Sequence, residues 1–246
     1  MRKPPAPEQE QARHDPAAPT GDRVGGDQAE LVRQAQRLYL RYATEIVEHY
    51  HFCPFARAAR KLQSMQLRVL LGQAPGPAAL SAALQPLPAA QVEVLLLLLP
   101  EYRGRPADLR QLAAHVRELD LLQGAWAVAD FHPLATLDLR SSDRAVPFIR
   151  STPDPTLQLL RYQSLHAVEQ ARPRVPDGTR CIDPAELWQV TQQAQPLRTQ
   201  IAAENLSTLR RIGAAQIQAR VQDILEDRRQ TYARLGVAPP PWETIP

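Results

Sequence analysis

The chain has 246 residues and a formal net charge of +3, a length that favours one large domain over two small ones. So small a charge argues against nucleic-acid binding. The longest uncharged apolar run, 94–99, is far shorter than the ~20 residues of a membrane helix, so we expect no membrane span. Two cysteines cannot form a disulfide framework, and reduced thiols are typical of a cytoplasmic protein.

Proline-rich sequence at both ends predicts tails around a single folded domain. Residues 1–26 carry mixed charges and almost no large apolar side chain, which predicts a disordered tail. Residues 236–246 read as an extended proline-rich tail. The domain between them, 27–235, should therefore hold all of the core, with a helical C-terminal part.

The first two-thirds of this domain alternate between helical and strand patterns. Apolar residues at spacings of three and four predict a first helix, and Pro54 is well placed to start a short second one. The predicted helices cover 27–50, 54–62, 77–84 and 106–119, and the predicted strands cover 66–71, 92–99 and 125–131. This order predicts an α/β fold: a small parallel or mixed sheet of about three or more strands with crossover helices, an added N-terminal helix and a C-terminal helical extension.

The last third reads as mainly helical. After a loop that reaches about residue 152, Asp154 as N-cap and Pro155 as first residue predict a helix over 155–171. A loop over 172–183 follows. Residues 184–234 should be helical, with a break at Gly213. An apolar stripe from Leu206 to Ile224 marks this last stretch. Arginines and acids flank the stripe, which favours a solvated ion-pair face over a nucleic-acid surface. The flanking arginines are Arg210, Arg211, Arg220, Arg228 and Arg229.

Four short motifs occur in a familiar order: FCPFARA at 52–58, ADFHP at 129–133, RSTPDPTLQLLR at 150–161 and ENLSTLRRIG at 204–213. Together they resemble an uncharacterised bacterial family, domain-of-unknown-function family 1415, over about 38–213. The resemblance implies positions of interest and no activity. Four residues depart from the family pattern, so this chain is a divergent member. His51 and Ile149 replace asparagines, Asp154 a tyrosine and Gln158 a histidine.

Cys53 and His132 are the candidate catalytic residues. A cysteine at the N-terminus of a helix, with Arg57 one turn on, should have a lowered pKa and favour the nucleophilic thiolate. The alternative is a small buried side chain. His132 follows a strand at the end where open α/β sheets bind ligands, which suits an acid, a base or a ligand. Its alternative is a histidine that hydrogen-bonds the loop.

The candidate anion-binding residues are Arg150, Ser151, Arg161 and Asn205. Arg150 and Arg161 bracket the predicted helix start at Pro155, where backbone amides and a guanidinium would bind a carboxylate or phosphate. A purely structural pairing of Arg150 with Asp154 or Asp143 is equally consistent. Asn205 lies in a predicted helix and should hydrogen-bond a neighbouring loop, for which the loop of Arg150 is the candidate.

Three functions remain open. The first is an enzyme-like pocket for a small anionic molecule, built from the Cys53/His132 pair and the arginine clamp. The second is a non-catalytic protein-binding module that docks a partner chain through the C-terminal helices. The third is metal or haem binding through Cys53 with His51 or His132, although the spacing fits no typical zinc site. No cofactor is identified, and enzymatic activity stays undecided.

Overall fold

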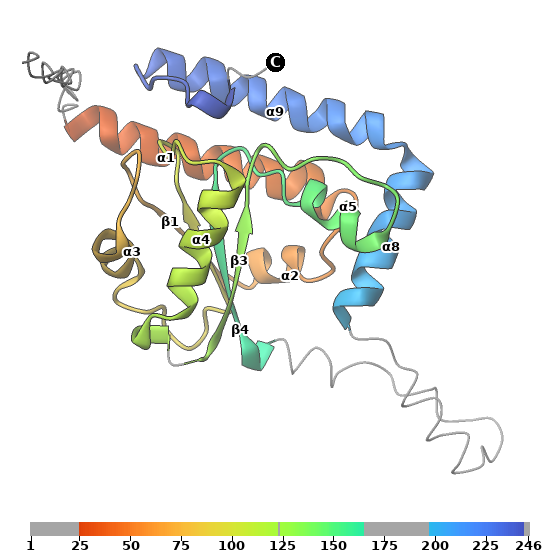
Figure 1. Cartoon of the computed structure of the whole chain (residues 1–246), viewed down its shortest axis with the longest axis horizontal. Helices are drawn as coiled ribbons and strands as arrows, with labels where there is room; N and C mark the ends of the chain where they lie inside the picture. The colour runs from red at the N-terminus through yellow and green to blue at the C-terminus, as the bar shows by residue number, and fades with distance from the viewer. Residues whose placement is uncertain (1–24, 123, 165–196, 244–246) are drawn as a thin grey trace, which may run out of the picture.

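The computed structural model describes residues 25–122, 124–164 and 197–243. Figure 1 shows strands and helices alternating in the N-terminal part and a helical pair in the C-terminal part. The predicted loop over 172–183, with Cys181, and most of the predicted 1–26 tail lie outside the described residues. The elements are α1 (Gly25–Tyr42), the π-helical turn η1 (Ala43–Glu48), α2 (Ala56–Lys61), β1 (Met65–Val69), α3 (Pro77–Leu84), β2 (Val94–Leu98), α4 (Pro106–Arg117), η2 (Asp120–Leu122), β3 (Trp126–Phe131), α5 (Ser142–Ile149), β4 (Thr156–Arg161), α8 (Leu197–Ile212), α9 (Ala214–Arg234) and η3 (Pro241–Glu243).

The described strands form one mixed sheet in the order β1-β2-β4-β3. β1 and β2 run parallel, and the chain crosses between them through α3. β4 runs antiparallel to both of its neighbours, β2 and β3. The predicted α/β class with a mixed sheet is confirmed, and the three predicted strands correspond to β1, β2 and β3.

The helix predicted over 155–171 is wrong at its start, because Thr156–Arg161 form the central strand β4. The alternation of side chains between the two faces explains why this segment is a strand. Leu157 and Leu159 point to one face of the sheet, and both are fully buried. The stretch predicted as loop before β4 contains α5, whose N-cap Ser141 accepts a hydrogen bond from the backbone N of Arg144 at 3.4 Å.

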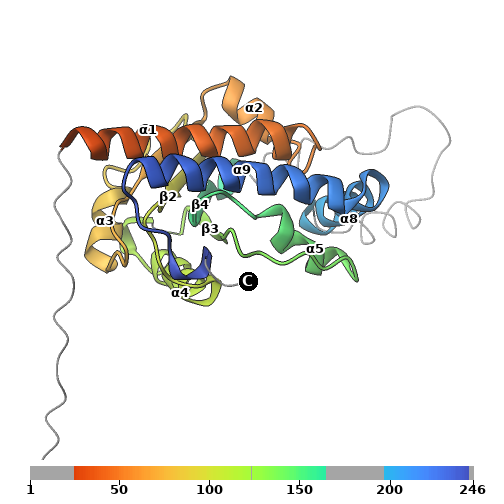
Figure 2. The ribbon, with the colours of Figure 1, turned by 90° about the horizontal axis from the view of Figure 1, so that it is seen from above.

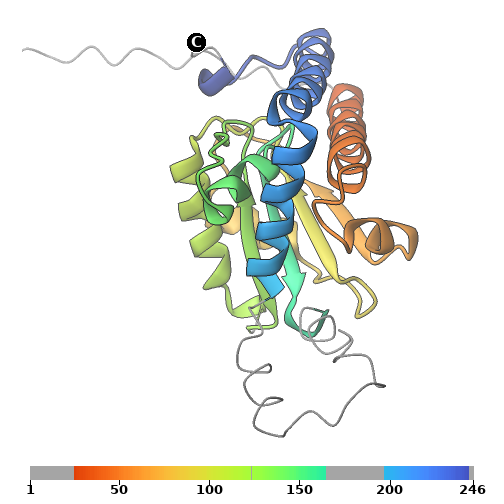
Figure 3. The ribbon, with the colours of Figure 1, turned by 90° about the vertical axis from the view of Figure 1, so that its right-hand side faces the viewer.

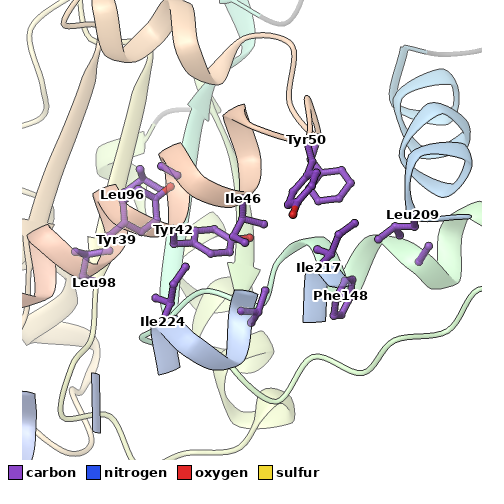
Figure 4. Packing of buried hydrophobic residues seen from close by; sticks show 14 of the residues in the cluster. Tyr39, Tyr42, Ile46, Tyr50, Leu96, Leu98, Phe148, Leu209, Ile217 and Ile224 are labelled. Atoms are coloured by element: carbon purple, nitrogen blue, oxygen red, sulfur yellow. The ribbon is translucent and has the colours of Figure 1, made fainter. Parts of the chain in front are cut away.

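Helices cover both faces of the sheet (Figures 2 and 3). One face packs under α3 and α4, with Leu95, Leu97 and Leu157 against Leu80 and Leu109. The opposite face packs against α1, η1, α5, α8 and α9. Figure 4 shows this second core, in which Leu96 and Leu98 of the sheet meet the aromatic rings of the first helical stretch. Its labelled members are Tyr39, Tyr42, Ile46, Tyr50, Leu96, Leu98, Phe148, Leu209, Ile217 and Ile224.

α9 packs along α1, so sequence-distant helices lie side by side (Figure 2). Arg37 and Arg41 of α1 both bind Asp227 of α9, at 2.8 and 2.9 Å. Gly213, with φ +94°, separates α8 from α9, which confirms the predicted break. No helix in the described part of the chain has the length and apolar character needed to cross a bilayer.

The apolar stripe of these C-terminal helices faces the domain itself. Leu209 and Ile217 are fully buried, and Leu206 packs against the same core. Burial within the domain therefore accounts for the stripe, and docking of a partner chain through these helices stays a prediction.

Candidate functional site

The structure separates the predicted site residues into three regions. Cys53, Arg150 and Asn205 lie on the side of the sheet that α1, η1 and α8 cover. His132 lies at the end of β3, in contact with the C-terminal segment. Arg161 lies at the opposite end of the β3–β4 pair from Arg150. Arg161 pairs with Trp126, the first residue of β3, whereas the backbone O of Arg150 accepts a hydrogen bond from the backbone N of His132, which follows β3.

Cys53 lies in the turn between η1 and α2, and its thiol is largely buried. The backbone amides of Phe55 and Ala56 donate toward the sulfur, but burial is the larger effect and raises the pKa of the Cys53 thiol. The expected lowering of this pKa is therefore wrong. α2 begins only at Ala56, and the Arg57 guanidinium is 3.7 Å from the buried Glu48 carboxylate, so its charge already has a partner.

Asn205 holds this turn in place. Its side-chain amide, buried on α8, donates to the backbone O of Phe52 at 3.0 Å. The expected bond to a neighbouring loop is present, and the loop is that of Cys53 rather than that of Arg150. A polar residue in the middle of α8 thus positions the residue next to the thiol.

Arg150 follows α5 and has an unusual environment for a cation. Its guanidinium lies 5.4 Å from the centre of the Phe131 ring, and it has no hydrogen bond or ion pair with any described residue. Burial lowers the pKa of Arg150, with Asp130 and Tyr42 close enough to oppose this effect. A half-buried, unpaired guanidinium is the group that an anion would satisfy.

Two buried tyrosines connect Arg150 with Cys53. Tyr42 donates from its hydroxyl to the backbone O of Ile149, the residue before Arg150. The Tyr39 ring lies 6.2 Å from the Tyr42 ring and is electrostatically coupled to Cys53. Figure 4 shows both tyrosines within one core. The thiol and the guanidinium therefore border the same aromatic layer.

Gln158 also belongs to this region, although the sequence marks it only as a departure from the family pattern. Gln158 pairs with Leu96 of β2 and with Ala129 of β3. Its side chain is therefore on the same face of the sheet as Leu96 and Phe131, the face that the core of Figure 4 covers. Its half-buried amide has no hydrogen-bond partner in the part of the chain that the structure describes. The signal was present: Gln158 is the polar residue between Leu157 and Leu159 of a buried strand. We call Cys53, Arg150, Gln158 and Asn205 the Cys53–Arg150 cluster.

His132 is buried and fully hydrogen-bonded. Its Nδ1 accepts from the backbone N of Leu134 at 3.1 Å, and its Nε2 lies 3.2 Å from the Gly104 carbonyl oxygen, to which it donates. Burial lowers the pKa of His132 to about 4, so the ring is neutral at pH 7. None of the ring's described contacts is shared with Cys53.

Arg161 and Ser151 have structural partners. Arg161 donates to the backbone O of Val92 at 2.7 Å and to that of Pro88 at 2.9 Å, and lies 4.3 Å from the Trp126 ring centre. Ser151 is buried and donates to the Ala135 carbonyl at 3.3 Å. Because β4 replaces the predicted helix, there is no helix N-terminus between Arg150 and Arg161 to complete the expected clamp.

His51, Cys53 and His132 do not come together as a metal site. The described residues contain no group of three or more His, Cys, Asp or Glu side chains placed to hold a metal ion. His51 is exposed in a turn with φ +58°. The metal interpretation therefore has no geometric support in this part of the chain.

We expect Cys53 to react slowly with alkylating agents. Its raised pKa keeps the thiol protonated at pH 7, and only the thiolate attacks. In a Cys181→Ala chain, iodoacetamide should modify native Cys53 at least ten times more slowly than the same residue in urea. Asn205→Ala, which frees the Phe52 carbonyl, should raise the native rate. Equal rates for native and unfolded chains would show that the turn does not protect the thiol.

Comparison with known proteins supports a family and no activity. The model of a family described as protein of unknown function (DUF1415) matches residues 35–179. No curated protein and no solved structure matches the chain significantly. The matched range includes Cys53, Gln158 and Arg150, whereas Asn205 and all of α8 and α9 lie beyond it.

Proposed function

Because the chain belongs to the DUF1415 family, whose description names no activity, we propose its function from the site alone: binding of a small anionic molecule at the Cys53–Arg150 cluster. The observation that carries this proposal is the Arg150 guanidinium. It is half-buried and unpaired among the described residues, and burial already works against its charge. An anionic ligand would supply a counter-charge in direct contact with the guanidinium.

The neighbours of Arg150 suit such a ligand. Gln158 offers an amide without a hydrogen-bond partner among the described residues, on the same sheet face as Phe131. Phe131 offers a flat apolar surface below the guanidinium. η1, directly before the Cys53 turn, is a π-helical segment, a feature frequent at functional sites. Groups of these kinds would suit a phosphate or carboxylate on a compact organic molecule.

Cys53 serves this site as a neutral thiol in the resting protein. Its raised pKa argues against a resting thiolate nucleophile. His132 and Arg161 belong to other parts of the fold, so binding by Arg150 is the part of the enzyme-like interpretation that the geometry supports. We place the protein in the cytoplasm, where a free thiol such as Cys53 stays reduced.

Replacement of Arg150 tests the binding function. Calorimetric titration with inorganic phosphate and with succinate should give saturable binding of at least one of them to the wild-type chain. Arg150→Gln should weaken that binding at least tenfold, since a hydrogen bond to a charged group contributes about 1.5–3 kcal/mol. The melting temperature of Arg150→Gln should stay equal or rise, because a half-buried unpaired charge is removed.

Arg144→Gln is the matched control. Arg144 lies on the same helix, α5, and its exposed guanidinium binds Asp138 at 3.2 Å. This variant should bind both anions as the wild type does. Unchanged binding by Arg150→Gln, or a large fall in its melting temperature, would instead assign Arg150 a structural role.

A further inference from the structure

The proline-rich C-terminal segment, predicted as an extended tail, folds back onto the domain. Gly236, with φ +66°, ends α9, and Val237 donates to the Tyr232 carbonyl at 2.9 Å, which reverses the chain direction. Residues 237–243, here called the strap, then run to η3. Trp242 of the strap is 3% exposed, and its indole N donates to the Tyr102 carbonyl at 3.2 Å.

Under the strap lies Arg228, which is 1% exposed. One side of its guanidinium is held firmly by the core: Nε donates to Asp154 at 2.7 Å and Nη2 donates to the Pro100 carbonyl at 3.1 Å. The other nitrogen, Nη1, donates to Glu243 of the strap at 3.2 and 3.3 Å. The strap therefore supplies the weaker of two carboxylate partners.

The indole of Trp242 fills the space beside this carboxylate. Its ring meets the His132 ring edge to face at 5.2 Å, and the Arg228 guanidinium lies 5.3 Å from its centre. A flat ring and a carboxylate thus occupy adjacent positions over one buried cation. Both come from two consecutive residues of the strap.

The strap and the residues that it covers come from different parts of the chain. The residues beneath the strap are here called the floor. Pro100, Tyr102, His132 and Asp154 form the floor, and all four lie within the range that matches the family model, 35–179. Arg228 and the strap lie outside it. The floor is at the carboxyl ends of the parallel strands β1 and β2, the edge where open α/β sheets bind ligands.

The strap does not pack flush against α9. A cavity of about 230 Å³ remains between them, lined by Arg228, Tyr232, Val237 and Glu243 among others. The strap thus spans a hollow that borders the buried guanidinium, and additional ligand atoms have room there.

We propose that this edge is a second ligand site, separate from the Cys53–Arg150 cluster, for a molecule that presents a carboxylate beside a flat aromatic ring. Trp242 and Glu243 occupy the site in the resting chain as an internal ligand. An external ligand binds when the strap leaves, because Arg228 keeps Asp154 and the Pro100 carbonyl as partners and Glu243 is the exchangeable anion.

The test offers the side chains of Trp242 and Glu243 to the site as a separate peptide. The probe is the peptide acetyl-Pro-Pro-Trp-Glu-amide, titrated calorimetrically into the full chain and into the full-length double variant Trp242→Ala/Glu243→Gln. We expect the double variant to bind the peptide at least ten times more tightly than the wild type, whose tethered strap competes at a high effective concentration. Replacing Glu by Gln or Trp by Ala in the peptide should each weaken this binding at least tenfold.

The full-length single variant Glu243→Gln keeps the buried indole and the Asp154–Arg228 pair, and therefore tests the proposal even if the double variant fails to fold. It should bind the peptide more tightly than the wild type. Two results would overturn the proposal: folded variants that do not bind the peptide, which would make the strap a fixed part of the core, and equal binding to wild type and variants, which would place the peptide elsewhere.

Discussion

Asp154→Ala should lower the free energy of unfolding by about 3–5 kcal/mol, the usual cost of removing one partner from a buried ion pair. Asp154 and Arg228 are 2% and 1% exposed, and their atoms are 2.7 Å apart. The same carboxylate accepts the Tyr232 hydroxyl at 2.6 Å. Its removal leaves a buried cation short of a partner and a buried hydroxyl without one, so two desolvation penalties act together.

Glu226→Ala provides the matched comparison on the same helix as Arg228. Glu226 also pairs with an arginine at 2.7 Å, Arg229, but the two side chains are 45% and 48% exposed. Exposed pairs contribute less than about 1 kcal/mol. Urea unfolding at pH 7 should therefore separate the two variants clearly. A loss of similar size in both would mean that burial does not set the strength of the Asp154–Arg228 pair.

The second large effect is a loss of stability on mild acidification, caused by His132. Burial lowers its pKa from 6.5 to about 4, so between these values the unfolded chain binds a proton that the native chain does not. Stability is therefore complete above pH 6.5 and falls as the pH decreases toward 4. At about 1.36 kcal/mol per pKa unit, the whole loss is about 3 kcal/mol, and about 2 kcal/mol is lost by pH 5.

His132→Asn should flatten this dependence between pH 7.5 and 5, whereas His49→Asn, at an exposed position, should leave it unchanged. Denaturant unfolding at several pH values measures both. The carboxylates with lowered pKa, Asp138, Asp227 and Glu48, act at the acid end of the range. If wild type and His132→Asn lose stability in parallel, the His132 ring does not carry the effect.

The sequence predicted the helices and strands whose patterns are local and failed where tertiary contacts decide. The apolar run of β2 and the proline at the start of α3 are local signals that suffice to predict these two elements. Asp154 and Pro155 form a typical helix start, but the Asp154 carboxylate binds Arg228 and Tyr232 instead of capping a helix. The strand that follows, β4, is explained by its place between β2 and β3, which the sequence alone does not show.

Of the predicted site residues, Cys53, Arg150 and Asn205 lie on one side of the sheet, whereas His132 and Arg161 lie elsewhere. The motif containing Cys53 and the polar Asn205 in mid-helix are visible in the sequence. The burial that raises the pKa of Cys53 is not, because it comes from packing against α1. Likewise, no local signal distinguishes Arg228 from Arg229, although one is buried and the other exposed. Arg228 is therefore an exception to the solvated ion-pair face expected along these helices.

The central place of β4 affects how the chain must assemble during synthesis. β1 and β2 are able to pair as soon as they leave the ribosome. Among the described strands β3 pairs with β4 alone, so it waits for Thr156–Arg161 to emerge. α1 precedes these strands and waits longer, since its long partner α9 follows all of them in the chain. Such long-range pairings slow folding and prolong the exposure of apolar surface. The nascent protein should therefore need chaperone protection until α9 is released.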